Sequence, residues 1–292
     1  MPSLLRRCRA ALRAPANEVA FALRSALAWS RGDAVLPRED PAGLYAWLPA
    51  DARAAARQHA DELGRRHDLA ALAARSTCAV FAHNLDLLDR LEALTRGVAP
   101  PDAGDGPLRA LDVGSGDFHY ATALQRFLAG PCSAGRPVEL VGVELDGHGI
   151  YRDGHSRADH ARAHAALAGP GVSFVVGDVA RLALPPQHVV TLLFPFVSAY
   201  PLLQWGLPLS RFRPRRLLRT AVAALRPGGW LVVANQTEAE FARLGALLAD
   251  QPVERVRSGS FASGTVPDAA RTAARIGSLW RRLGPAIDTA VR

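Results

Sequence analysis

Short apolar runs alternate with amphipathic stretches from residue 108 to the end of the chain. Apolar runs bounded by turn residues predict buried strands, and apolar positions three and four residues apart predict helices. After the first run, Ala121, Leu124 and Phe127 have helical spacing. The alternation predicts an α/β protein with a mainly parallel sheet. The predicted strands are 108–113, 138–143, 172–176, 189–194, 230–234, 253–261 and 276–281.

The first part of the chain has a different pattern. Residues 1–98 carry helical periodicity, most clearly in 51–65 and 69–94, and Pro-rich residues 37–41 predict a break between helices. Residues 99–107 are rich in Pro, Gly and Asp, which is typical of a linker. We therefore expect a helical region over 1–98, a linker over 99–107 and an α/β domain over 108–292.

The most informative motif is Leu-Asp-Val-Gly-Ser-Gly-Asp at 111–117, where the first predicted strand turns into a helix. Glycines at 114 and 116 suit a tight turn whose amides lie close to a ligand. A dinucleotide site would have a third glycine at 119, which is His119. The chain contains no lysine, so it has no Walker-type phosphate loop. A nucleoside ligand without a pyrophosphate fits the motif better.

Later strand ends add acidic residues. Glu144 ends the second predicted strand, where a carboxylate accepts hydrogen bonds from ribose hydroxyls. Asp178 follows the third strand, and the turn Leu-Arg-Pro-Gly-Gly at 225–229 precedes the fifth. Each residue has a plainer interpretation. Asp112 could serve only to cap the glycine turn or the helix after it. Glu144 could be a solvated carboxylate at a strand end, and Asp178 could be an ordinary turn residue.

This order of motifs resembles the class I S-adenosylmethionine-dependent methyltransferases over residues 108–292. The family pattern of an acidic residue followed by three spaced glycines is matched by Asp112, Gly114 and Gly116, whereas Phe118 replaces the third glycine. The resemblance implies a Rossmann-like, seven-stranded, mostly parallel sheet with helices on both faces and a reversed last strand. It also implies an enzyme that uses S-adenosylmethionine as its cofactor.

The resemblance assigns the cofactor site residue by residue. The backbone of Gly114, Ser115 and Gly116 would pass the methionine part, which Asp112 would orient. Glu144 would hold the ribose, and Asp178 with Val179 would meet the adenine. Phe194 completes the implied site at the end of the fourth strand.

The methyl acceptor is less defined by the sequence. Residues 194–200 lack the Asn/Asp-Pro-Pro-Tyr/Phe signature of amino-methylating family members, which argues against an exocyclic base nitrogen. We expect a small-molecule acceptor. The alternatives are an RNA or protein methyltransferase, if the arginines at 211–219 form one strip beside the cleft, and a non-catalytic module that binds the cofactor. Candidates for a base that takes the acceptor's proton are His119, Tyr120, Tyr151, His155 and Tyr200.

Composition bears on whether the protein has a nucleic-acid partner, a disulfide framework, a metal site or a membrane span. All 35 basic residues are arginine, so the net charge of +8 is weak evidence for a nucleic-acid partner. Three widely spaced cysteines predict neither a disulfide framework nor a zinc site, and they favour a cytoplasmic setting. No metal is expected, because the histidines do not follow a His-Glu-x-x-His pattern. Prolines within the longest uncharged stretch, 182–210, argue against a transmembrane helix.

The N-terminal region has two interpretations. Its first residues are rich in arginine, which is typical either of a basic amphipathic helix or of an organelle transit peptide. We expect the helical region to pack beside or over the cofactor cleft, and a dimerisation or partner-binding surface is the alternative. Trp29, Tyr45 and Trp47 are candidates for a lid or an interface, or for simple core positions.

Overall fold

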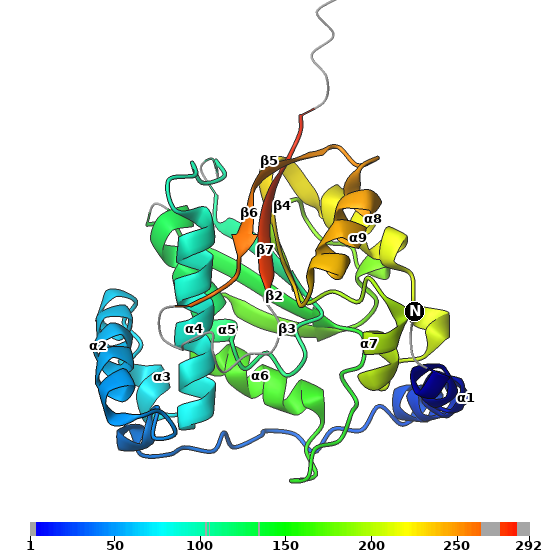
Figure 1. Cartoon of the computed structure of the whole chain (residues 1–292), viewed down its shortest axis with the longest axis horizontal. Coiled ribbons are helices and arrows are strands. Elements are labelled where there is room, and N and C mark those ends of the chain that lie inside the picture. Colours follow the sequence, from blue (N-terminus) through cyan, green and yellow to red (C-terminus); the bar gives the residue numbers. More distant parts are fainter. Residues whose placement is uncertain (1–3, 103, 105, 134, 264–274, 285–292) are drawn as a thin grey trace, which may run out of the picture.

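The computed structural model describes residues 4–102, 104, 106–133, 135–263 and 275–284 of the 292-residue chain (Figure 1). A seven-stranded sheet crosses the centre of the molecule, in the order β3-β2-β1-β4-β5-β7-β6. The first five strands are parallel, and β7 runs antiparallel to both of its neighbours. The strands are β1 (Leu108–Val113), β2 (Val138–Glu144), β3 (Val172–Val176), β4 (Gln187–Leu193), β5 (Leu225–Asn235), β6 (Val253–Ser260) and β7 (Ile276–Arg282).

Helices cover both faces of this sheet. On one face α4, α5 and α6 pack with α2 and α3 outside them, and on the other face α8 and α9 pack against β4 and β5. The helices are α1 (Leu4–Leu27), α2 (Ala50–Arg66), α3 (Ala70–Ala74), α4 (Cys78–Thr95), α5 (Ala121–Phe127), α6 (Arg157–Ala168), α7 (Ala199–Gln204), α8 (Pro214–Ala224) and α9 (Glu238–Leu248). Short helical turns are η1 (Pro41–Gly43), η2 (Leu128–Cys132), η3 (Val179–Arg181) and η4 (Leu209–Arg211). The predicted fold class is therefore confirmed, including the reversed last strand.

Local sequence signals set several helix ends. The Thr77 hydroxyl accepts the Val80 N–H and begins α4, and Ser156 with Asp159 forms a capping box at the start of α6. Thr77 also interrupts the stretch 69–94, in which the sequence predicted helical periodicity. The chain makes α3 and α4 there instead. The fifth strand also begins earlier than predicted, because Leu225 pairs with Gln187 before the turn at Gly228.

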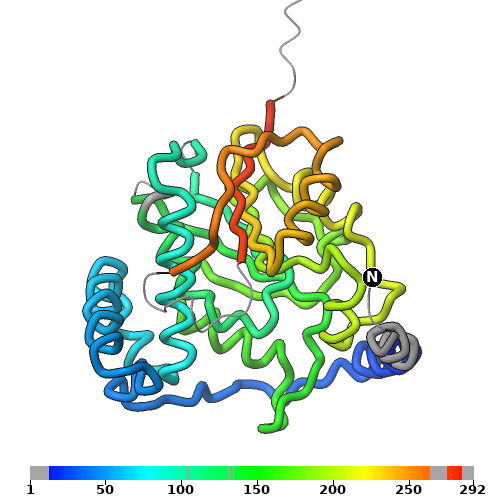
Figure 2. The backbone as a smooth tube through the Cα atoms, viewed as in Figure 1, coloured from blue at the N-terminus to red at the C-terminus, as the bar shows by residue number. Residues whose placement is uncertain are grey.

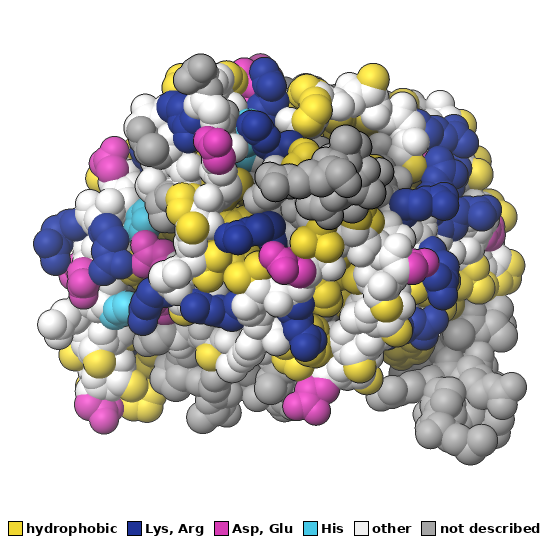
Figure 3. Space-filling view, turned by 90° about the horizontal axis from the view of Figure 1, so that it is seen from above, with side chains coloured by type: hydrophobic (Ala, Val, Ile, Leu, Met, Phe, Trp, Pro, Cys, Tyr) yellow, Lys and Arg dark blue, Asp and Glu magenta, His cyan; other side chains and the backbone are white. Residues whose placement is uncertain are grey.

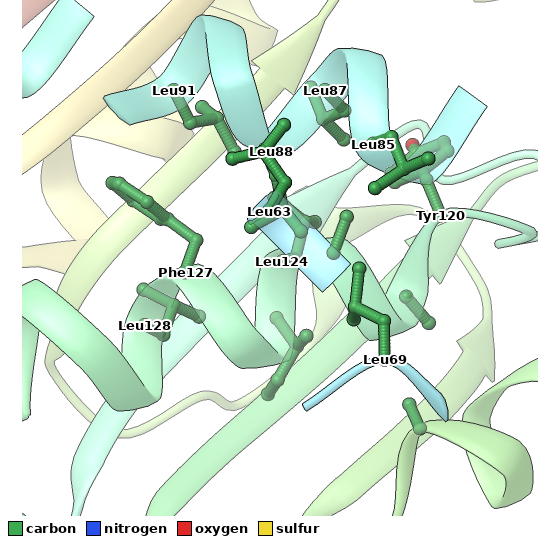
Figure 4. Close-up of a cluster of buried hydrophobic side chains, with 14 of the residues drawn as sticks. Leu63, Leu69, Leu85, Leu87, Leu88, Leu91, Tyr120, Leu124, Phe127 and Leu128 are labelled. Atoms are coloured by element: carbon green, nitrogen blue, oxygen red, sulfur yellow. The ribbon is translucent and has the colours of Figure 1, made fainter. Parts of the chain in front are cut away.

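The helical N-terminal region and the sheet share one hydrophobic core. Leu85, Leu88 and Leu91 of α4 face Leu124 and Phe127 of α5, which itself packs on the sheet (Figure 4). The expected linker, 99–107, carries no helix or strand in its described residues. The packing means that α2 to α4 are held against the α/β region by buried apolar side chains, which stabilise in proportion to the area they remove from water.

The remaining N-terminal elements wrap the molecule. Helix α1 lies against α7, on the opposite side from α2 (Figure 2). Residues 28–40, here called the strap, join α1 to η1 and run past the start of α6. None of the helices in the described residues combines the length and the apolarity that crossing a bilayer requires.

Candidate functional site

A cavity of about 870 Å³ opens at the carboxyl ends of the parallel strands. The chain leaves β1 toward β2 and β3 on one side and returns to β4 and β5 on the other, so the ends of β1 and β4 form a topological switch point. Ligands of open α/β sheets bind in the crevice at such a point. The residues at the strand ends that line the cavity are Val113, Gly114, Glu144, Gly177, Leu193, Phe194 and Gln236.

The glycine turn after β1 has the backbone that its sequence predicts. Gly114 and Gly116 have φ values of +81° and +61°, which side-chain-bearing residues rarely adopt. The turn is tied to β2, because Gly114 donates its N–H to the Val143 carbonyl at 2.8 Å. The Ser115 hydroxyl is buried and donates to backbone carbonyls of Asp112 and Val143, so it fixes the turn from inside. The backbone of all three residues 114–116 faces the cavity.

Phe118, at the position of the missing third glycine, also has a left-handed backbone, with φ of +56°. Its ring is fully buried and lies edge-to-face with Tyr120, with ring centroids 5.9 Å apart. Gly142 of β2 makes room for this ring. Phenylalanine at position 118 therefore keeps the left-handed turn, but its ring requires a glycine at position 142 of the neighbouring strand β2.

Asp112 is fully buried and does not line the cavity. Its carboxylate accepts hydrogen bonds from the hydroxyls of Tyr120, at 2.9 Å, and Thr191. Burial raises the pKa of Asp112 to about 6, against the lowering effect of these hydroxyls. The structure thus places this carboxylate behind the glycine turn, where it organises β1, β4 and the start of α5.

Glu144, by contrast, lies at the cavity wall with 4% of its surface exposed. Its Oε2 accepts the Gly116 N–H at 2.9 Å, and its Oε1 accepts the Asp146 N–H at 3.0 Å. A carboxylate has about four acceptor positions, so each oxygen keeps a lone pair for a further donor. Glu144 can therefore hold two ligand hydroxyls while it anchors the glycine turn.

Asp178, Val179 and Phe194 also line the cavity. Asp178 caps η3 by accepting the Ala180 N–H at 3.0 Å, and its Oδ2 lies 3.9 Å from nitrogens of Arg181 and Arg216. Val179 is buried and offers an apolar surface beside it. Phe194 has a φ of +62°, and the guanidinium of Arg275 lies 4.8 Å from its ring centroid. The structure brings every predicted cofactor residue except Asp112 to one cavity.

The five acid–base candidates separate into two groups. His119, Tyr120 and Tyr151 line the cavity, whereas His155 and Tyr200 are not among its lining residues. Tyr120 donates to Asp112, and burial followed by the Asp112 charge raises its pKa well above the usual value. Burial and then the charge of Asp117 raise the pKa of Tyr151 to about 12. Both phenols are therefore neutral donors, which leaves His119 as the candidate base.

His119 belongs to a hydrogen-bonded group that the sequence did not reveal. Its Nδ1 lies 2.6 Å from the Asp117 carboxylate, and its Nε2 lies 3.1 Å from Nδ1 of His83 on α4. Burial alone would raise the pKa of Asp117, but the hydrogen bond and charge of His119 outweigh it and hold the pKa well below the usual range. Asp117 therefore remains ionised and orients the imidazole, an arrangement that assists proton transfer.

The N-terminal helices contribute other residues that sequence reasoning missed. Asp86 and Arg90 of α4 form a buried ion pair in the cavity wall, and the Arg90 guanidinium lies 5.4 Å from the Phe261 ring centroid. The signal was an acid and a base four residues apart in a predicted helical stretch, which places them on one helix face. Trp205, which follows α7, forms the facing wall. Trp29, Tyr45 and Trp47 do not line the cavity, and Tyr45 is a core residue.

Helix α1 fastens the segment that closes one side of the cavity. Asn17 donates to the carbonyls of Leu203 and Leu207, and Glu18 accepts from the backbone and hydroxyl of Ser210. Arg24 binds both oxygens of the Asp146 carboxylate, at 3.2 and 2.9 Å. These contacts attach α1 to the rim at residues 199–211 and at the exit of β2.

Comparisons with known proteins agree with this fold. No family model and no curated protein matches the sequence. Solved structures similar to the chain include TrmN from Thermus thermophilus, with 19% identity and a TM-score of 0.43 over 66% of this chain. The chain spans about half, 48%, of that protein's length. A SAM-dependent methyltransferase from Aquifex aeolicus matches with 13% identity and a TM-score of 0.47, covering 68% of this chain and 93% of that one.

A 16S rRNA (adenine(1408)-N(1))-methyltransferase from Catenulisporales acidiphilia matches with 17% identity and a TM-score of 0.41. The match covers 62% of this chain and 87% of that one. These similarities are similarities of fold. The chemistry of this chain follows from the side chains of its own cavity.

Proposed function

We propose that the protein is a methyltransferase that uses S-adenosylmethionine and methylates a small molecule. The observation that carries this proposal is the convergence of the Gly114–Gly116 turn, Glu144 and Asp178 on one cavity, from the ends of three adjacent strands. This combination suits a nucleoside joined to an amino acid chain by a short link without phosphate, because the sequence has no lysine and no phosphate loop.

The residues present fit the cofactor. The free lone pairs of Glu144 match the two ribose hydroxyls, Asp178 and Val179 offer a polar and an apolar contact for the base, and the left-handed glycine turn exposes backbone to the methionine part. The bound cofactor supplies a methyl group on a positively charged sulfur, ready for in-line displacement. The protein's contribution is to hold the acceptor against that methyl group and to exclude water.

The proton of the acceptor is taken by the Asp117–His119–His83 group. With Asp117 accepting from Nδ1 of His119, Nε2 of His119 accepts from Nδ1 of His83, so that a proton taken up by His83 can pass to Nε2 of His119. An acceptor hydroxyl or amine that reaches these imidazoles loses its proton to them as it gains the methyl group. The two histidines come from different regions of the chain, so the N-terminal helix α4 is part of the proposed active site.

The shape of the cavity supports a small acceptor. Its volume of about 870 Å³ falls within the range of about 300–1,000 Å³ typical of small-molecule sites. Besides the residues proposed for the cofactor, the cavity is lined by Phe196 and Phe261 and by the buried Asp86–Arg90 pair. We infer an acceptor with an apolar body and at least one polar group, covered by α4 on one side and by the α1–α7 contact on the other.

An RNA acceptor is the second candidate, because Arg181, Arg211, Arg213 and Arg216 line the mouth of the cavity. Basic side chains bind phosphates, and several together favour nucleic acid. Figure 3 views the molecule from above and shows several arginines side by side at the right of that face, with acidic and apolar side chains over the rest of it. Two arginines of the segment 211–219 also contact other side chains: Arg215 lies 3.6 Å from Asp250, and the Arg211 guanidinium lies over the Phe21 ring.

Calorimetric titration with S-adenosylmethionine and S-adenosylhomocysteine tests the proposal. We expect saturable binding of both, and transfer of labelled methyl from the cofactor into a small-molecule metabolite extract. Transfer only into total RNA would establish the second candidate. Binding without transfer into any acceptor would identify a non-catalytic module, and no binding of either compound would refute the cofactor assignment.

A further inference from the structure

A tight turn on the outer rim of the cavity brings together three potential metal ligands. Gly154 donates its N–H to the Tyr151 carbonyl, and Tyr151 donates to the His155 carbonyl, so residues 151–155 reverse the chain. Within this turn the Asp153 carboxylate lies 3.3 Å from Nδ1 of His155. His160, one turn into α6, places its Nε2 2.9 Å from the same carboxylate oxygen. The three ligand atoms all lie within 4.8 Å of one another.

The group differs from a simple ion pair because two imidazoles, His155 and His160, share the one carboxylate of Asp153. Nδ1 of His155 is buried and has no hydrogen-bond partner among the described residues, although the Asp153 oxygen is only 3.3 Å away. A buried nitrogen left without a partner costs free energy. The 3.3 Å between Nδ1 of His155 and the Asp153 oxygen is also a spacing that two ligands of a common ion have. The two imidazole planes are 72° apart, so they approach from different directions.

We propose that Asp153, His155 and His160 bind one divalent transition-metal ion of the zinc type. Two imidazole nitrogens and a carboxylate are a ligand set that suits such ions. Metal–ligand bonds of about 2.0–2.2 Å place neighbouring ligand atoms roughly 3.0–3.6 Å apart, close to the spacings seen here. Water would fill the remaining coordination position. This proposal departs from the expectation of no metal, which was based on spacing along the chain: His155 and His160 lack the usual spacing, and Asp153 joins them only through the turn.

The surroundings of the turn indicate what the ion does. The strap holds the turn from outside, because the Trp29 indole donates to the Gly154 carbonyl and the Arg31 guanidinium donates to the Asp153 carbonyl. From the same turn Tyr151 reaches the cavity and donates to Asp117 at 3.2 Å. Its ring lies edge-to-face on His160, with centroids 4.9 Å apart. A bound ion would therefore fix the turn, and with it the wall that Tyr151 provides.

The site is tested on the full-length protein, freed of any polyhistidine tag and of metal, without need of a methyl acceptor. Titration with Co²⁺ is expected to give visible ligand-field absorption that saturates at one ion per chain and is displaced by Zn²⁺. We expect His155→Ala and His160→Gln each to weaken Co²⁺ binding by at least about tenfold. Asp153→Asn tests the carboxylate with little change in volume.

His59→Ala is the matched control, because His59 lies 3.2 Å from Asp89 and its Nε2 likewise has no hydrogen-bond partner among the described residues. This variant should bind Co²⁺ like the wild type. Zn²⁺ should also slow amide exchange at Tyr151 and Gly154 in the wild type but not in the His155 variant. Absence of the absorption, or equal affinity in all variants, would overturn the metal site and leave Asp153 as an ion-pair partner of two imidazoles. Neither result depends on the proposed methyl transfer.

Discussion

The ring of Phe118 occupies the space that a side chain on Gly142 would need. A Cβ built on Gly142 would lie 2.7 Å from Cε1 of this ring, closer than such atoms are found. Phe118 follows the glycine turn and Gly142 lies in β2, so the contact joins the two elements that hold Glu144 in place. The fit between this large residue and this glycine lets the turn function with a phenylalanine in a left-handed conformation.

Gly142→Ala should therefore destabilise the protein by about 1–3 kcal/mol, the usual cost of overpacking a core. Urea unfolding measures this change. Gly64→Ala in α2 is the control, because a Cβ there meets no atom within 4 Å, and it should be neutral or stabilising. In a Phe118→Ala background the cost of Gly142→Ala should disappear. An equal cost with and without the ring would show that the two residues do not interact.

Glu144→Ala should weaken S-adenosylmethionine binding by roughly tenfold or more, because a charged hydrogen-bond partner of the ribose is lost. Calorimetry at constant pH measures the dissociation constant. Glu139→Ala is the matched control on the same strand, since Glu139 is half exposed and pairs with Arg109 away from the cavity. Unchanged affinity in the Glu144 variant would show that the ribose binds elsewhere.

Because the carboxyl group of Asp112 is buried, we expect the free energy of unfolding to depend on pH. Its pKa of about 6 in the folded protein lies above the ordinary value of 3.8, because burial penalises the charged form. Its contribution is therefore fully present below about pH 4 and is lost as the pH rises through about 6. Relative to the neutral variant Asp112→Asn, the wild type should lose up to about 3 kcal/mol between pH 4 and pH 7. Unfolding curves of both proteins that shift in parallel across this range would contradict the prediction.

If the Asp117–His119–His83 group takes the acceptor's proton, replacing His119 should lower turnover and leave cofactor binding intact. Once an acceptor is identified, His119→Ala should lower kcat by about 10²–10⁴, the usual contribution of a general base, while the dissociation constant of S-adenosylhomocysteine stays unchanged. Tyr200→Phe is the control, because Tyr200 is not among the residues that line the cavity. A kcat equal to that of the wild type in the His119 variant would remove this residue from the mechanism.

Arg24→Ala should loosen the rim of the cavity. Its partner Asp146 is nearly buried, and after the substitution Arg157, at 3.5 Å, is the one ion-pair partner left to this carboxylate among the residues that the structure describes. We expect a loss of about 1–2 kcal/mol in stability, from hydrogen bonds to a charged group, and faster amide exchange over residues 199–211. Arg13, exposed on the same helix, supplies the control variant Arg13→Ala. Exchange rates unchanged at 199–211 would show that α1 does not hold this segment.

The sequence predicted the α/β region well for a physical reason. Strands β1 and β3 have the predicted bounds, because their apolar runs are bounded by turn residues. The convergence of Gly114, Glu144 and Asp178 on one cavity was also predictable, since these residues follow strands directly. Strand β4 begins two residues earlier than expected, at Gln187, where a register shift interrupts the pairing with β5.

The acceptor side was not predictable in the same way. His83 and His119 lie 36 residues apart on separate helices or turns, and only the packing of α4 on α5 brings them together. Likewise, Asp112 matches the motif, yet Tyr120 and Thr191 surround its carboxylate behind the turn. Contacts between distant segments depend on tertiary packing, which local pattern does not encode.

Helix α1 has a consequence for the order in which the chain assembles. It precedes its partners in the chain, yet those partners lie far along it: Asp146 is 122 residues after Arg24, and Ser210 is 192 residues after Glu18. Contacts of such separation form only after the intervening loop has closed, and domains fold as synthesis proceeds. During synthesis α1 therefore has no surface to pack against until β4 and the segment 199–210 have emerged from the ribosome. Helix α1 can therefore dock only after residues 199–210 have been made, before β5, α9, β6 and β7 are complete, and its docking completes the rim of the cavity.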